Sequence, residues 1–138
     1  MTLNPDLVRA RCADIEDAVA RLERFGAMPV EDFRANHDLT DAACYRLLVA
    51  IEAALGLCYH VSAKHLRKVP EQFAECFRTL SEAGVVPGDL AERLQAMARL
   101  RNVLVHLYAK VDTARVHEII RHVLGDLQAF ASAIARLL

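Results

Sequence analysis

Apolar residues near the start of the chain recur at spacings of three, four and seven positions. This spacing places them along one face of an α-helix, where about 3.6 residues complete a turn. Asn4 can cap such a helix and Pro5 suits its first position, whereas Gly26 and Pro29 end the pattern. The sequence therefore predicts a first helix from Asn4 to about Gly26. Its apolar stripe consists of Leu7, Ala10, Ile15, Ala18, Val19, Leu22 and Phe25.

A second and longer helical pattern begins at Asp38 or Thr40 and continues to about Arg67. Residues 47–61 of this pattern are apolar around most of the helix circumference, which is typical of a buried central helix. Residues 30–36 before it are predicted to form a connector or a short helical turn.

Three more helices are predicted in the remaining sequence. One covers Glu71 to Ala83, the next runs from Pro87 through Leu104, and Asp112 caps a last helix with an apolar face. No segment alternates with the period of two that is typical of strands. The 138 residues fit one domain with one core. We therefore expect a single all-α domain over residues 1–138, folded as an antiparallel bundle of four to five helices.

Composition and charge narrow the possible functions. The chain has 17 basic and 18 acidic residues, so its formal net charge is −1. A protein that binds long nucleic acids by charge alone is usually more basic. With no Trp and 6% aromatic residues, a broad base-stacking platform is also excluded. A local basic cleft stays open, and the Lys64–Lys68 stretch either complements a helix dipole or forms an anion-binding rim.

The four cysteines lie inside helical apolar patterns, at positions 12, 44, 58 and 76. None belongs to a C-x-x-C pair or has zinc-ligand spacing to two histidines. We expect four small, buried, reduced side chains, no metal site and no cofactor. Reduced thiols indicate a cytoplasmic protein.

No membrane-targeting segment is predicted. Met1 to Arg11 contains no apolar signal core. The longest apolar run, Leu47 to Val61, is interrupted by Glu52 and His60, and it is too short and polar to span a bilayer.

Polar side chains gather in the segment Arg101-Asn102-Val103-Leu104-Val105-His106-Leu107-Tyr108. On a helix, Arg101 and Tyr108 share a face, and so do Asn102 and His106. Arg101 and His106 are five residues apart and therefore about 140° apart around the axis. A shared active centre thus requires that the helix ends near His106 or that a second subunit completes the site.

These side chains have the chemistry that RNA cleavage without a metal requires. An Arg donates to phosphate and keeps its charge, and a His exchanges protons near neutral pH. Asn102 would orient the imidazole of His106, and the hydroxyl of Tyr108 can accept a transferred group. Two structural alternatives remain, because a His beside an apolar helix is usually structural and Arg101 can simply pair with a carboxylate.

The segment 101–108 resembles the signature of HEPN proteins, in which an Arg and a polar residue are followed after three more residues by His. The added Tyr108 resembles the HepT form of this signature. The resemblance extends over about residues 40 to 130. Its other parts are Ala50–Ala54, Tyr59-His60, Val69–Leu80, Ala83–Pro87 and Tyr108–Asp112.

This resemblance implies more than the spacing does. HEPN proteins of this type are helical homodimers in which the motifs of two subunits line one cleft. HepT proteins are ribonuclease toxins that need no metal, and an antitoxin nucleotidyltransferase of the MntA type neutralises them by attaching AMP to the motif Tyr. Arg101 and His106 would then be catalytic, Asn102 supporting and Tyr108 the modified residue. Arg99-Leu100 departs from the family pattern, which would either alter the packing under the motif or add positive charge to the cleft.

Two other functions remain compatible with the sequence. The domain could be a non-catalytic module that binds a nucleotidyltransferase and holds nucleotide or phosphate, or a structural helical dimer without a site.

Overall fold

The computed structural model describes residues 3–106 and 112–138. Throughout these two ranges the regular secondary structure is helical, with no strand. The helices are α1 (Pro5–Ala27), α2 (Val30–Ala35), α3 (His37–Lys64), α4 (Phe73–Glu82), α5 (Gly88–His106) and α6 (Thr113–Ala135).

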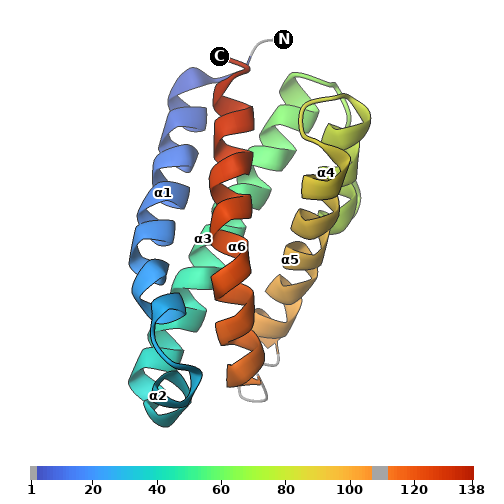
Figure 1. The fold of residues 1–138 in the computed structure, drawn as a ribbon. Helices are drawn as coiled ribbons and strands as arrows, with labels where there is room; N and C mark the ends of the chain where they lie inside the picture. The colour runs from blue at the N-terminus through green and yellow to red at the C-terminus, as the bar shows by residue number, and fades with distance from the viewer. Residues whose placement is uncertain (1–2, 107–111) are drawn as a thin grey trace.

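The four long helices α1, α3, α5 and α6 form an antiparallel bundle, and the short helices α2 and α4 lie at its periphery (Figure 1). α1 packs most closely against α3 and α6, and α4 packs most closely against α5. The predicted fold class is confirmed. The short helical turn expected at residues 30–36 is α2, which lies at the end of the bundle opposite the C-terminus.

Side-chain caps set three helix starts. The Oδ1 atom of Asn4 accepts a hydrogen bond from the backbone N–H of Leu7 at 3.2 Å, as the sequence predicted. Asn36 caps α3 through Leu39 in the same way, so α3 starts slightly earlier than predicted. Asp112 caps α6 through the N–H of Ala114 at 3.0 Å.

The core is continuous through the bundle, and α3 is its central element. Thirteen residues of α3 are buried, which explains why its sequence is apolar on nearly all sides. Aromatic contacts join the other helices to this core. The rings of Phe77 on α4 and Phe130 on α6 meet edge to face with centroids 5.4 Å apart.

The cysteines require a correction. Cys58 on α3 and Cys76 on α4 are buried, as predicted, but they form a disulfide and are not reduced thiols. The cysteines therefore no longer support the expected cytoplasmic location. Their Cα atoms lie 6.1 Å apart, within the usual range for a disulfide. Cys12 and Cys44 are free; Cys44 is buried as predicted, whereas Cys12 is only partly buried. The sequence could not predict this pairing, because residues 58 and 76 become neighbours only when α4 packs on α3.

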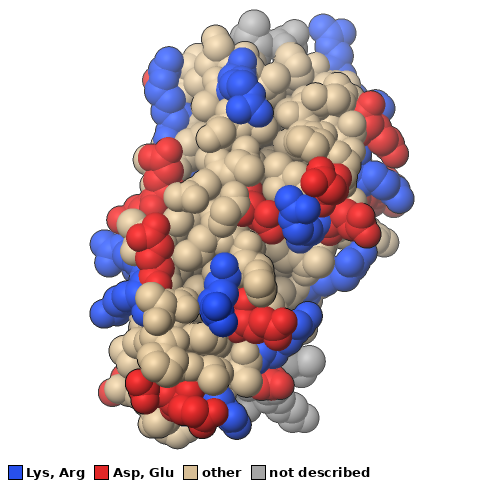
Figure 2. All heavy atoms as spheres, in the orientation of Figure 1, with Lys and Arg blue, Asp and Glu red and all other residues tan. Residues whose placement is uncertain are grey.

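Charges of both signs are dispersed over the face that Figure 2 shows, around a surface along the middle of the bundle that carries few charged side chains. Residues 47–61 alone were predicted to be too short and polar to span a bilayer, but the whole of α3 is long and apolar enough to do so by length and composition. Half of its most apolar stretch is buried inside the bundle. This is the pattern of a core helix.

Candidate active site

Arg101 on α5 is held by contacts with two other helices. Its Nε atom donates to Oε1 of Glu52 on α3 at 2.6 Å. Its guanidinium carbon lies 4.8 Å from the centre of the Phe73 ring at the start of α4. A charge-assisted hydrogen bond and a cation–π contact thus fix the guanidinium from two directions.

The guanidinium keeps donors for a ligand. Glu52 occupies the Nε donor, and Nη1 makes a long 3.4 Å contact with Oδ1 of the neighbouring Asn102. Arginine carries five N–H groups in a rigid fork, so donors at Nη1 and Nη2 remain. About 23% of the Arg101 side chain is exposed, which is enough for an anion to reach it.

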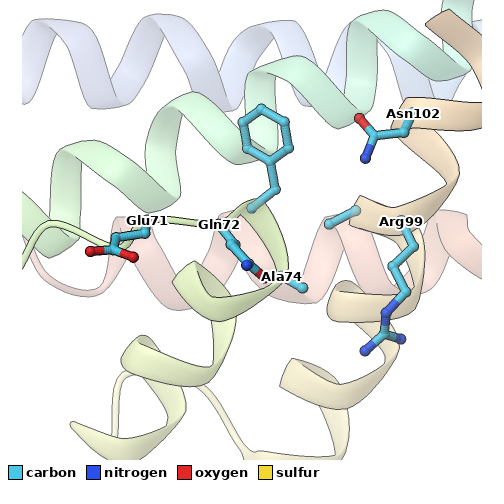
Figure 3. Close-up of a pocket in the computed structure, with 7 residues that line it drawn as sticks. Glu71, Gln72, Ala74, Arg99 and Asn102 are labelled. Carbon is cyan, nitrogen blue, oxygen red and sulfur yellow. The ribbon is translucent and has the colours of Figure 1, made fainter. Parts of the chain in front are cut away.

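A hollow of about 370 Å³, which Phe73 also lines, lies between the start of α4 and the later turns of α5. Arg99 and Asn102 approach it from α5, and Glu71, Gln72 and Ala74 approach it from the start of α4 (Figure 3). Arg99 therefore adds positive charge beside the motif, which is one of the two effects expected from its departure from the family pattern. The Glu71 carboxylate lies at the opposite edge.

The two other motif residues, His106 and Tyr108, are not fully covered by the described residues. His106 is the last described residue of α5, and its side chain lies outside the description. Tyr108 also lies outside the described residues. Since α5 is helical from Gly88 to His106, positions 101 and 106 are about 140° apart around one helix axis. One chain therefore does not bring Arg101 and His106 to the same face of α5.

Glu52 is the site residue whose role the sequence did not resolve. In the sequence, the sign of such a role was a single carboxylate within an apolar helical pattern. The structure places this carboxylate against Arg101. His60 has a different role, because its Nε2 atom accepts a hydrogen bond from the backbone N–H of Asn4 at 3.0 Å. It attaches the chain before α1 to α3 and has no described contact with the motif.

The basic stretch Lys64–Lys68 lies at the end of α3. Arg67 has a positive φ of 57° in the turn that leaves the helix, and the N–H of Lys68 donates to the carbonyl of Ser62. Lys64 is twelve residues beyond Glu52 and thus about 18 Å further along the helix axis. Lys64 is therefore far from Arg101 along α3.

No group of three or more His, Cys, Asp and Glu side chains in residues 3–106 and 112–138 is arranged to hold a metal ion. The arrangement around Arg101 is suited to binding an anion through guanidinium and amide donors.

The chain is similar in sequence and in fold to several known proteins. The mRNA nuclease HepT of Shewanella oneidensis is 22% identical over 129 residues, which cover 94% of this chain and 96% of that protein. A solved structure of the tri-AMPylated Shewanella oneidensis HEPN toxin in complex with its MNT antitoxin superimposes with a TM-score of 0.86 at 22% identity, covering 95% and 98% of the two chains. The cytosolic protein YutE of Bacillus subtilis, of unknown function, has a TM-score of 0.85 at 16% identity, covering 97% and 90%.

These structures confirm the predicted HEPN fold. The model of the Ribonuclease HepT-like family matches residues 15–134, which is most of the chain and includes Glu52, Phe73 and the whole motif. The predicted family, and with it the predicted class of ribonuclease, is confirmed: the chain belongs to the Ribonuclease HepT-like family.

Proposed function

We propose that this protein is a metal-independent endoribonuclease and the toxin of a toxin–antitoxin pair, formed by one HepT-like domain over residues 1–138. The observation that carries the proposal is the fixed guanidinium of Arg101, held by Glu52 and Phe73 with donors left free. Membership of the HepT-like family supports the reaction class.

The reaction would be a transfer of phosphate within the RNA chain. The 2′-oxygen attacks the adjacent phosphorus, the bond from phosphorus to the 5′-oxygen breaks, and a 2′,3′-cyclic phosphate and a 5′-hydroxyl result. His106 would exchange protons with the 2′-hydroxyl or the leaving oxygen. Arg101 would stabilise the charge that develops on the phosphate oxygens, and Asn102 would orient the imidazole. No metal or cofactor is required in this scheme.

A homodimer would solve the geometric problem of the motif. Positions 101 and 106 lie on different sides of α5, so an Arg from one subunit and a His from the other would border one cleft. Val103 and Val105 support this arrangement. They are 37% and 42% exposed on either side of the buried Leu104, and a second copy would cover them.

Regulation would act at Tyr108. A nucleotidyltransferase of the MntA type would transfer AMP from ATP to the tyrosine hydroxyl, with formation of an O–P bond and release of pyrophosphate. The adduct would bring bulk and negative charge close to the RNA-binding site. The solved complex of a HEPN toxin with its MNT antitoxin supports this proposal, and the cytosolic relative YutE supports a cytoplasmic location.

Expression in bacterial cells tests the proposed function. The parent protein should inhibit growth, and Arg101→Ala and His106→Ala should abolish inhibition while circular dichroism shows an unchanged helical fold. Retained toxicity in both variants would refute the proposal. Tight binding of the partner without RNA cleavage would instead identify the non-catalytic module. Co-expression with the partner should produce an AMP adduct that mass spectrometry maps to Tyr108.

Mixed dimers test the shared cleft. If each centre combines Arg101 of one subunit with His106 of the other, mixing the two inactive variants should restore part of the activity. One of the two centres in a mixed dimer then carries both intact residues. No recovery in a mixture that demonstrably exchanges subunits would contradict this composite site.

A further inference from the structure

A second basic surface lies between α1 and α3, outside the Arg101 site. It is a hollow of about 440 Å³. Three arginines and one tyrosine provide its polar lining, and no acidic residue lines it. The lining residues are Ala20, Arg21, Arg24, Phe25, Ala42, Tyr45 and Arg46. We call this surface the α1–α3 hollow.

Two of these arginines stack on aromatic rings. The guanidinium carbon of Arg24 is 4.5 Å from the centre of the Phe25 ring, and that of Arg46 is 5.6 Å from the centre of the Tyr45 ring. A guanidinium held by a ring loses little conformational freedom when it binds. Its N–H groups can still form paired hydrogen bonds with a phosphate.

The positive charge of the hollow exceeds the negative charge beside it. Asp17 contacts Arg21 at 3.0 Å and Arg46 at 3.9 Å. Asp41 lines the neighbouring hollow, which Tyr45 also borders, and does not line this one. Among the residues that the structure describes, Arg24 forms no ion pair. Three guanidinium groups therefore face one contacting carboxylate, which leaves positive charge for an anionic ligand.

The hollow is connected with the Arg101 site along the surface of α3. Tyr45 is seven residues before Glu52, so the two share one face of α3 about 10 Å apart. Tyr45 also borders a small hollow that Leu104 of α5 lines, and Leu104 is one turn beyond Arg101. The α1–α3 hollow and the Arg101 site therefore lie close enough along α3 for one RNA strand to contact both.

We infer that the α1–α3 hollow is an additional binding site for single-stranded RNA, in which Arg24 and Arg46 bind backbone phosphates away from the scissile bond. Tyr45 favours RNA over an acidic peptide, because this residue is 62% exposed beside Arg46 and its ring can stack on a base. The inference rests on the proposed ribonuclease function and identifies where the substrate extends beyond Arg101.

Fluorescence anisotropy with a labelled single-stranded RNA oligonucleotide tests the inference, in a His106→Ala background that prevents cleavage. The double variant Arg24→Gln/Arg46→Gln should bind the RNA about 10-fold more weakly. Its affinity should also depend less on KCl, with a log–log slope smaller by about 1.4, or about 0.7 per lost phosphate contact. Asp17→Asn should act in the opposite direction and tighten binding, because it removes the carboxylate that competes for Arg21 and Arg46.

A charge-matched control is Arg9→Gln/Arg78→Gln, which removes two exposed arginines from α1 and α4 that pair weakly with Asp6 and Glu75. It should bind RNA like the parent. Equal RNA binding by the parent, the Arg24→Gln/Arg46→Gln hollow variant and the control would overturn the inference. It would also be overturned if the hollow variant bound RNA like the parent and lost only its binding to the nucleotidyltransferase partner. Cleavage by the otherwise unmodified protein is measured separately. If the unmodified protein cleaves RNA and the hollow variant binds RNA as tightly as the parent, this inference fails and the proposed ribonuclease function stands.

Discussion

Arg101 and Glu52 are 49 residues apart in the sequence, yet Nε of the arginine and Oε1 of the glutamate are 2.6 Å apart. The pair joins α5 to α3 at the place where the HEPN motif begins. Glu52 contacts the Nε edge of the guanidinium and leaves other donors for phosphate. Glu52 is therefore a positioning residue in our account, and it does not itself touch the substrate.

Glu52→Ala should lower kcat for RNA cleavage by about 10- to 100-fold, because a misplaced guanidinium loses contact with the developing charge. KM should change less, since much of the affinity for RNA comes from other phosphate contacts. Glu52→Gln should recover part of kcat, because its amide oxygen can still accept the Nε hydrogen bond. Steady-state kinetics with a short RNA substrate provide the measurement.

Glu82→Gln is the matched control, since Glu82 lies on α4 and makes only an exposed contact with Arg78 at 3.8 Å. Its kcat should equal that of the parent. If Glu52→Ala cleaves at the parental rate, or faster, then Glu52 does not position Arg101 for the reaction.

The sequence predicted the fold better than the site. Helix starts are local, so Asn4 and Asp112 could be recognised as caps from a few neighbouring residues. α4 begins at Phe73 rather than at Glu71, because Gln72 is extended and provides no side-chain cap. The contacts of Arg101 with Glu52 and Phe73 depend on how α3, α4 and α5 pack, which spacing along one helix does not encode.

The disulfide should stabilise the fold. Cys58 and Cys76 are 18 residues apart, and closing a loop of this size stabilises a protein by about 3 kcal/mol in the chain-entropy model. Urea unfolding of the oxidised protein should therefore give a higher free energy of unfolding than unfolding with a reductant. Cys76→Ala should unfold identically with and without reductant. Equal stability of the oxidised and reduced parent would show that the bond contributes nothing.

Stability should also fall in mild acid because of His60. Burial, and then the nearby Lys64, lower the pKa of His60 below its ordinary value of 6.5. The unfolded chain then binds a proton at a higher pH than the folded chain does. The contribution of His60 to the free energy of unfolding is complete above about pH 6.5, and it is lost as the pH falls below this value.

Thermal unfolding at several pH values measures this effect. Protonation of His60 would also remove the acceptor for the N–H of Asn4. The Tm should drop between pH 7.5 and 5.5, and His60→Gln should show a smaller drop because glutamine does not titrate. The same drop in parent and variant would assign the pH dependence to other groups.

Cleavage of single-stranded RNA by the purified protein in excess chelator tests the central claim most directly. We predict cleavage products that end in a 2′,3′-cyclic phosphate, with activity reduced by at least about 100-fold in Arg101→Ala and in His106→Ala. Products that form only when a divalent metal is added, or that form equally with both variants, would contradict the account.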